Sequence, residues 1–322
     1  QHCGQRILVT GLRSGGRPPQ PALILLRNLS RRRLTSPKST YSSSSSSSAS
    51  TSSAGRRLIR GGVTCAGLGL ATFAVGRVSL YERLKGTAGG LIGDGGLDVR
   101  RWLPSDWRHY PMHAYALIGV NAIVFLLWQL PAARPVLNRW AMLWPSRLGP
   151  LSLIGSMFSH QHWLHLLVNM LVLHSFAPAL TAQLGSPEEF LCLYACSGLC
   201  AGFMHAALIP SLPCIGASGC LLGIFAYTAI TNPDAKVGLV LISSLFPDLQ
   251  FTAYNAFLAM VAFDVAGLCR LFNLGLSHAA HLGGSAFGTA YANGLRPWLW
   301  LHWGDLALGC WLRLKRAVSG GR

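Results

Sequence analysis

Two short segments contain residues that could do chemistry together. Gly216-Ala217-Ser218-Gly219 opens one uncharged apolar stretch, and Ala280-His281-Leu282-Gly283-Gly284 opens another further along the chain. A serine hydroxyl is a weak nucleophile until a base lies within hydrogen-bond reach. An ionisable residue inside a membrane segment is costly, which indicates a function. We therefore expect Ser218 to be a nucleophile and His281 to be its general base and acid.

Glycines in both segments provide a way to bring this serine and this histidine together. Small residues four positions apart let two membrane helices approach closely, and each segment has such a pair, namely Gly219 with Gly223 and Gly284 with Gly288. We predict that the two helices pack through these glycines and that His281 thereby reaches Ser218. The alternative is a glycine-packed helix pair in which Ser218 only caps its helix and His281 is structural.

A second pair of polar residues, His165 and Asn169, lies in another apolar stretch. Residues four apart are neighbours on one face of a helix, and polar side chains in lipid need hydrogen-bond partners or a water-filled cavity. Donors of this kind can stabilise the oxyanion that forms when a serine attacks a carbonyl. We expect this role for His165 and Asn169, with structural hydrogen bonding between helices as the alternative.

The composition predicts a helical membrane protein. Of the 322 residues, 51% are hydrophobic and 11% are charged, against roughly 25% charged in a typical soluble domain. About 20 apolar residues suffice to cross the hydrocarbon core. Three long stretches contain no Asp, Glu, Lys or Arg, and they lie between Arg147 and Glu188, between Glu189 and Asp234, and between Arg270 and Arg296. The expected fold class is an all-α polytopic membrane protein in a lipid bilayer.

The apolar stretches predict a core of six transmembrane helices preceded by one extra N-terminal transmembrane helix. The expected crossings cover residues 61–80, 112–130, 163–180, 190–209, 217–230, 251–272 and 279–291. The crossing at 217–230 reaches only about 21 Å at about 1.5 Å per residue, so Ser218 should lie below the membrane surface. Residues 134–161 and 236–247 are expected to be embedded or interfacial without crossing.

The chain divides into four regions on this basis. Residues 1–55 are rich in Arg and Ser and free of acidic residues, which is the composition of an organelle transit peptide; a disordered tail is the alternative. Residues 56–110 hold the extra helix and a linker, and residues 111–296 hold the six-helix core. Residues 297–322 have the character of an interfacial amphipathic segment.

Several other functions are disfavoured. The net charge of +17 does not indicate nucleic-acid binding, because 12 of the 27 basic residues precede Glu82 rather than lying on a folded module. There is no His-Glu-x-x-His motif and the nine cysteines lack a metal-ligand spacing, so no metal or other cofactor is expected. Only Asp264 lies inside a crossing, whereas an aspartyl protease needs two carboxylates. No repeated pair of broken helices indicates a transporter.

Three motifs together resemble those of the rhomboid intramembrane serine proteases: His165-x-x-x-Asn169, Gly216-Ala217-Ser218-Gly219, and Ala280-His281-Leu282-Gly283-Gly284 followed by Gly288. The extra helix before the core and the sequence around His278 and His281 are most similar to those of the mitochondrial, presenilin-associated rhomboid-like branch. The resemblance covers residues 110–296. One departure is Arg139-Trp140, which reverses the Trp-Arg pair that many family members carry in the loop between the first two core crossings.

The resemblance implies a serine endopeptidase that uses a Ser218–His281 dyad, an acyl-enzyme and no essential acid. His165, Asn169 and the backbone N–H of Ser218 would hold the oxyanion. The substrate would be a single-pass membrane protein that is cut within or beside its transmembrane helix. The alternative is an inactive rhomboid-like protein that binds client transmembrane helices, although inactive relatives lack the serine or the histidine.

Two further expectations concern Asp264 and the location of the protein. We expect Asp264 to form an interhelical hydrogen bond rather than to act as a triad acid, so that Asp264→Asn keeps substantial activity. The transit-peptide composition and the branch resemblance favour the mitochondrial inner membrane. A plastid membrane is the alternative, because serine-rich transit peptides also serve there.

Overall fold

The structure is a computed structural model that describes residues 46–88, 111–238, 250–272 and 274–319. Its internal contacts divide the chain into Gln1–Ala49 and Ser50–Arg322. Apart from the start of helix α2, everything below concerns the second of these units.

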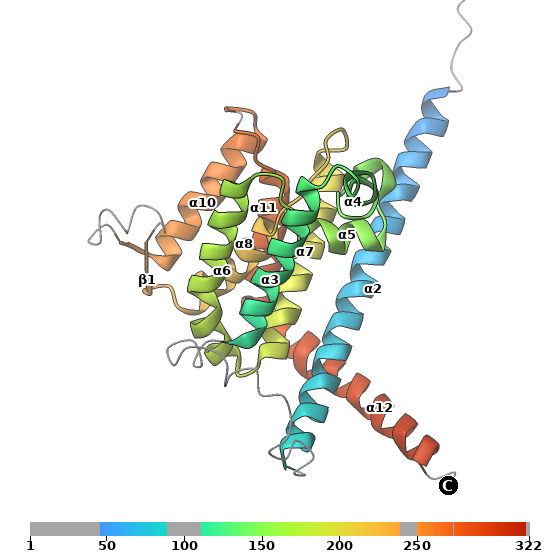
Figure 1. The fold of residues 1–322 in the computed structure, drawn as a ribbon, viewed down its shortest axis with the longest axis vertical. Coiled ribbons are helices and arrows are strands. Elements are labelled where there is room, and N and C mark those ends of the chain that lie inside the picture. Colours follow the sequence, from blue (N-terminus) through green and yellow to red (C-terminus); the bar gives the residue numbers. More distant parts are fainter. Residues whose placement is uncertain (1–45, 89–110, 239–249, 273, 320–322) are drawn as a thin grey trace, which may run out of the picture. The chain divides into compact units, whose positions relative to one another are not determined.

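Apolar helices make up most of the described residues (Figure 1): α2 (Ser46–Ala88), α3 (Met112–Gln129), α6 (Trp163–Leu184), α7 (Pro187–Leu208), α8 (Ser218–Thr231), α10 (Ala253–Leu268) and α11 (His278–Ala290). A helix satisfies its own backbone hydrogen bonds, which is a requirement for crossing lipid. Four of them, α2, α3, α6 and α7, are long and apolar enough to cross a membrane, whereas α8 and α10 are apolar but shorter. The predicted mostly helical membrane protein is thus confirmed, and the count of seven crossings stays a prediction.

Three short elements connect α3 to α6: α4 (Arg134–Trp140), the 3-10 turn η3 (Pro145–Arg147) and α5 (Pro150–Ser156). A proline stands at the start of each, where its fixed φ favours a new helical turn and its missing N–H costs nothing. The longest has seven residues, too few to cross a membrane. The prediction that residues 134–161 do not cross is therefore confirmed.

Short elements also flank α10 and follow α11. Strands β1 (Lys236–Val237) and β2 (Phe251–Thr252) pair antiparallel, with Lys236 opposite Thr252. The expected non-crossing segment at 236–247 begins with β1, and its part from residue 239 onward lies outside the described residues. After α11 the chain continues through the π-helical turns η4 (Tyr291–Leu295) and η5 (Pro297–Trp303) into α12 (Gly304–Ser319).

Helix α2 is longer than the sequence predicted. The boundary at residue 55 assigned residues 46–55 to the tail, but the helix begins at Ser46. Extending an existing helix adds one hydrogen bond per residue without the cost of a new nucleus. Small polar residues in front of an apolar helix can therefore join it, so the helix starts well before the expected crossing at 61–80. The boundary of the tail at residue 55 stays a prediction.

Small side chains on α7 let α2 pack closely against it. The Cys192 thiol donates to the Thr72 carbonyl (3.3 Å), and the Cys196 thiol donates more weakly to the Gly69 carbonyl (3.8 Å). Both cysteines are buried. At both positions a small, polarisable thiol side chain fills the contact between α2 and α7.

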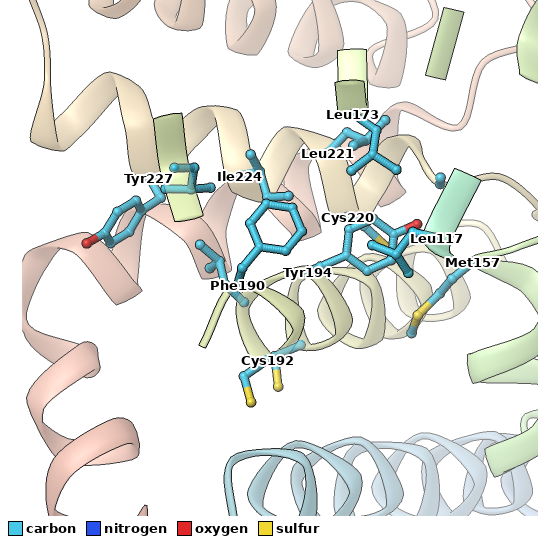
Figure 2. Close-up of a cluster of buried hydrophobic side chains, with 14 of the residues drawn as sticks. Leu117, Met157, Leu173, Phe190, Cys192, Tyr194, Cys220, Leu221, Ile224 and Tyr227 are labelled. Atoms are coloured by element: carbon cyan, nitrogen blue, oxygen red, sulfur yellow. The ribbon is translucent and has the colours of Figure 1, made fainter. Parts of the chain in front are cut away.

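The centre of the helix bundle lies where α7, α8 and α11 contact one another. Apolar side chains of several helices meet there (Figure 2), including Leu117 of α3, Leu173 of α6, Phe190 and Tyr194 of α7, and Leu221 and Ile224 of α8. Lipid is as apolar as these side chains, so close packing rather than removal from water favours their association.

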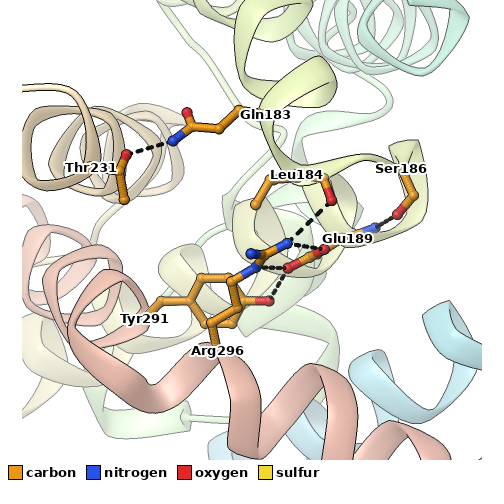
Figure 3. Close-up of polar contacts among 7 residues, drawn as sticks. All are labelled: Gln183, Leu184, Ser186, Glu189, Thr231, Tyr291 and Arg296. Atoms are coloured by element: carbon orange, nitrogen blue, oxygen red, sulfur yellow. Dashed lines mark hydrogen bonds and ion pairs between the residues drawn. The ribbon is translucent and has the colours of Figure 1, made fainter.

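An ion pair between a buried glutamate and a partly exposed arginine ties the start of α7 to the chain that follows α11 (Figure 3). The Arg296 guanidinium donates to both carboxylate oxygens of Glu189 (2.6 and 3.1 Å), and the Tyr291 hydroxyl donates to the same carboxylate (2.7 Å). The Nη2 of Arg296 that donates to Glu189 also donates to the Leu184 carbonyl at the end of α6 (3.3 Å). Glu189 is fully buried, and a buried carboxylate is stable only with partners of this kind.

Replacing Arg296 by methionine should lower the free energy of unfolding by about 3 kcal/mol, because Glu189 then stays buried without its charged partner. Unfolding of the purified protein in detergent, followed by circular dichroism, measures the change. Arg313→Met, at an exposed arginine of α12, is the matched control and should unfold like the wild type. Unfolding of Arg296→Met at the wild-type midpoint would show that the pair does not hold these ends together.

Candidate active site

A glycine turn places Ser218 at the first residue of α8. Gly216 has φ +124°, a left-handed conformation that other residues rarely adopt. Its N–H donates to the Ser156 carbonyl (2.9 Å), and a Cβ at this position would lie 2.7 Å from Cε1 of His165. Only glycine therefore fits this turn, which leaves the Ser218 side chain partly exposed at the helix N-terminus.

The side chain of His281 reaches Ser218 from α11. Its Nε2 lies 2.9 Å from Ser218 Oγ, and the histidine is 8% exposed. The two helices approach through backbone contacts: a Cβ at Gly284 would overlap the Gly219 carbonyl, and a Cβ at Gly288 would overlap the Gly223 carbonyl. The structure thus brings together the serine, the histidine and the glycines that the sequence singled out.

The two residues expected at the oxyanion lie beside the Gly216 turn. The His165 ring packs against Gly216. Asn169 is 5% exposed, and its Nδ2 donates to the His165 carbonyl (2.9 Å) and lies 3.1 Å from Nε2 of His160. His165 therefore faces the loop that carries Ser218. Asn169 lies one helical turn further along α6, and its two amide hydrogens are directed at the His165 carbonyl and at His160.

His160, which the sequence did not single out as a site residue, links Asn169 to this loop. It is fully buried before the start of α6. Its Nε2 lies 3.1 Å from Asn169 Nδ2 and 3.4 Å from the backbone N–H of Ala217. Burial, with a smaller contribution from His165, lowers the pKa of His160 to about 3. The ring is therefore neutral, and its Nε2 can accept both hydrogen bonds.

A second cluster of polar residues lies on the other side of His281. Asp264 of α10 is 1% exposed, and its Oδ1 lies 2.9 Å from Nδ1 of His281 and 2.7 Å from Nδ1 of His278. Asp264 thus makes the interhelical hydrogen bonds that the sequence predicted. One of its partners is His281 itself, so the carboxylate contacts the imidazole of the expected dyad. The donor atoms of these three residues lie within 4.8 Å of one another, a spacing that could also hold a metal ion.

A further buried histidine connects the segments that precede α8 and α11. Nε2 of His205 lies 2.8 Å from the Leu212 carbonyl, and its Nδ1 lies 2.6 Å from Oγ of Ser277. A carbonyl only accepts, so Nε2 carries the hydrogen, and Nδ1 of the neutral ring accepts from the Ser277 hydroxyl. No sequence signal marked His205, because Ser277 is distant in the chain and Leu212 contributes only a backbone carbonyl.

Two cavities among the described residues lie away from this chemistry. A cavity of about 690 Å³ is bordered by Phe176 of α6, by Thr228 and Asn232 at the far end of α8 from Ser218, and by β1. A second cavity of about 280 Å³ borders Trp128 and Arg134. Neither is lined by the histidines or the serine described above.

Replacing Gly284 by alanine should slow the reaction of Ser218 with a fluorophosphonate by roughly 100-fold, because the added methyl group separates α8 from α11 and a displacement of about 1 Å can cost this much. The labelling rate of the purified protein measures the effect. Gly119→Ala in α3, where a Cβ would meet nothing within 4 Å, is the matched control. Equal labelling rates in both variants would contradict the glycine contact.

The sequence of this chain matches the rhomboid domain family over residues 147–298. Rhomboid protein 1, mitochondrial, of Saccharomyces cerevisiae is 40% identical over 185 residues, which are 55% of this chain and 51% of that protein. Presenilin-associated rhomboid-like protein A, mitochondrial, of Danio rerio is 36% identical over 183 residues, which are 54% and 45% of the two chains. The Homo sapiens presenilin-associated rhomboid-like protein, mitochondrial, is 31% identical over 189 residues, or 57% and 48%.

The chain spans about half the length of these relatives. Ser218, His281, His165 and Asn169 all lie inside the matched residues. Residues 147–298 of the chain thus match the rhomboid domain, and the chain is similar to mitochondrial rhomboid proteins.

Proposed function

We propose that this protein is an intramembrane serine endopeptidase with Ser218 as its nucleophile and His281 as its general base and acid. The observation that carries the proposal is the 2.9 Å contact between Ser218 Oγ and His281 Nε2. Two side chains with these chemistries, joined by a hydrogen bond, form the arrangement that serine acyl transfer needs. The match to the rhomboid domain over residues 147–298 and the similarity to mitochondrial rhomboid proteins support intramembrane proteolysis in general.

In the acylation step, Ser218 Oγ attacks the scissile carbonyl carbon while its proton passes to His281 Nε2. The tetrahedral intermediate then collapses, the bond between carbon and nitrogen breaks, and His281 gives the same proton to the leaving amine. The product is an acyl-enzyme on Ser218. A water molecule, activated by His281, then attacks the ester, and the acid product leaves as Ser218 regains its proton.

His165, Asn169 and the backbone N–H of Ser218 stabilise the oxyanion of the tetrahedral intermediate. The first N–H groups of a helix have no partner within that helix, so the start of α8 offers such donors beside Ser218 Oγ. The position of His165 against Gly216 supports its part in this role. For Asn169, one amide hydrogen must leave an acceptor that it contacts in this structure, either the His165 carbonyl or His160.

The substrate is a single-pass membrane protein that enters from the bilayer and is cut within or next to its transmembrane segment. Helix α8 has only 14 residues, so Ser218 at its start lies below the membrane surface and meets peptide bonds there. The full topology is a core of six transmembrane helices within residues 111–296, preceded by α2. Helix α12, with basic residues on an otherwise apolar helix, lies at the interface.

The protein acts in mitochondria, as a multi-pass protein of the inner membrane. The relatives named above are mitochondrial proteins, and the Arg-rich, acid-free residues 1–55 have the composition of a transit peptide. The alternative function, an inactive rhomboid-like protein that binds client helices, is disfavoured because both Ser218 and His281 are present and in contact.

Ser218→Ala and His281→Ala should each abolish cleavage of a reconstituted single-pass substrate, because each removes one partner of the proton transfer. Gel analysis of the products in proteoliposomes measures cleavage, and circular dichroism checks that the variants are folded. Ser175→Ala and His302→Ala, at exposed residues outside the site, are the matched controls. Full activity of either site variant would refute the dyad, and binding of substrate without cleavage by the wild type would favour the inactive alternative.

His165→Ala and Asn169→Ala should each lower kcat by about 10²- to 10³-fold with little change in KM, as expected for the loss of one oxyanion donor. Steady-state cleavage of a fluorogenic transmembrane peptide measures both constants. A rise in KM at constant kcat would instead assign these residues to substrate binding.

A further inference from the structure

We infer that Asp264 is a positioning residue for His281, so that the site works as a line of three groups, Ser218, His281 and Asp264, from three different helices. The inference rests on the proposed function and departs from the dyad that the family resemblance implies. It is carried by two contacts of the same imidazole: Nε2 lies 2.9 Å from Ser218 Oγ, and Nδ1 lies 2.9 Å from Asp264 Oδ1.

The carboxylate determines which ring nitrogen of His281 carries the proton. An ionised carboxylate can only accept hydrogen bonds, so the hydrogen of the neutral imidazole is on Nδ1. Nε2 is then left with its lone pair directed at the Ser218 hydroxyl, which is the tautomer that a general base needs. When Nε2 takes the serine proton, the negative charge of Asp264 stabilises the imidazolium that forms.

The burial of Asp264 argues against a chance contact. The residue is 1% exposed on a helix of apolar residues, and an ionised carboxylate in such a place is costly unless it is paired. Among the described residues, its carboxylate contacts two histidines of α11, His278 and His281. The charge is therefore stabilised through the same helix that carries the general base.

His278 holds the carboxylate in place. It lies one helical turn before His281, and its Nδ1 is 2.7 Å from the same Oδ1. Its ring packs edge-on against Phe263 and Phe272. A Cβ at Gly267, one turn after Asp264, would overlap this ring. A link between α10 and α11 thus already exists through His278, so the second contact to His281 is not needed for packing alone.

Asp264→Asn should lower kcat for the fluorogenic peptide by about 10²- to 10⁴-fold and leave KM within about twofold, because an amide can donate to Nδ1 and favour the wrong tautomer of His281. This result is the opposite of the substantial activity that the sequence alone led us to expect. Asp234→Asn, at an exposed loop residue, is the matched control. The assays contain a chelator so that no metal ion occupies the cluster.

The variant His278→Phe separates positioning from structural support. It should destabilise the protein but reduce kcat less than Asp264→Asn does, because Asp264 keeps its contact with His281.

A spectroscopic measurement on the wild type makes the test independent of how well the variants fold. Protein labelled with ¹⁵N-histidine should show His281, assigned by the loss of its signals in His281→Gln, with the hydrogen on Nδ1. Hydrogen on Nε2, or wild-type kcat in a folded Asp264→Asn, would overturn the inference. Retained cleavage in Ser218→Ala would instead refute the proposed function, and the tautomer measurement would still decide the role of Asp264.

Discussion

The site depends on one contact, the backbone-to-backbone approach of α8 and α11 through their glycines. No methyl group fits between Gly284 and the Gly219 carbonyl, or between Gly288 and the Gly223 carbonyl. In lipid there is little hydrophobic gain from joining two apolar helices, so close packing of small residues must favour the pair. Larger side chains would hold these helices further apart and place His281 beyond hydrogen-bond reach of the serine.

Polar contacts then fix α11 near both of its ends. Near its start, His278 and His281 share the Asp264 carboxylate of α10. Just past its end, Tyr291 and Arg296 meet the buried Glu189 of α7. Each carboxylate is costly in an apolar bundle and stable only with its partners in place. The two clusters therefore restrict how α11 can slide or rotate against its neighbours, which is what precise placement of a general base requires.

Much of this arrangement could be predicted from sequence, because the limits of the helices and the glycine spacing are local properties. Helices α3, α6, α7, α8 and α11 begin and end close to the predicted residues, since Pro, Gly and the ends of uncharged stretches determine where a membrane helix can start and stop. The start of α2 was missed, because a run of small polar residues is compatible with both a tail and a helix. The strand pair of β1 and β2 was missed because two-residue strands leave no periodic pattern.

By itself, the sequence determined the fold class, the candidate nucleophile, the candidate base and the small residues that let their helices touch, because each depends on residue type and spacing along one segment. The tertiary structure alone decided which of the other polar residues matter. His160 and His162 look alike in the sequence, yet only His160 is buried and bonded to the site. In the sequence Asp264 is a single acid in an apolar helix, and only the packing of α10 against α11 shows that it contacts His281. The direction and partner of a buried polar side chain depend on residues distant in the chain, which no local pattern encodes.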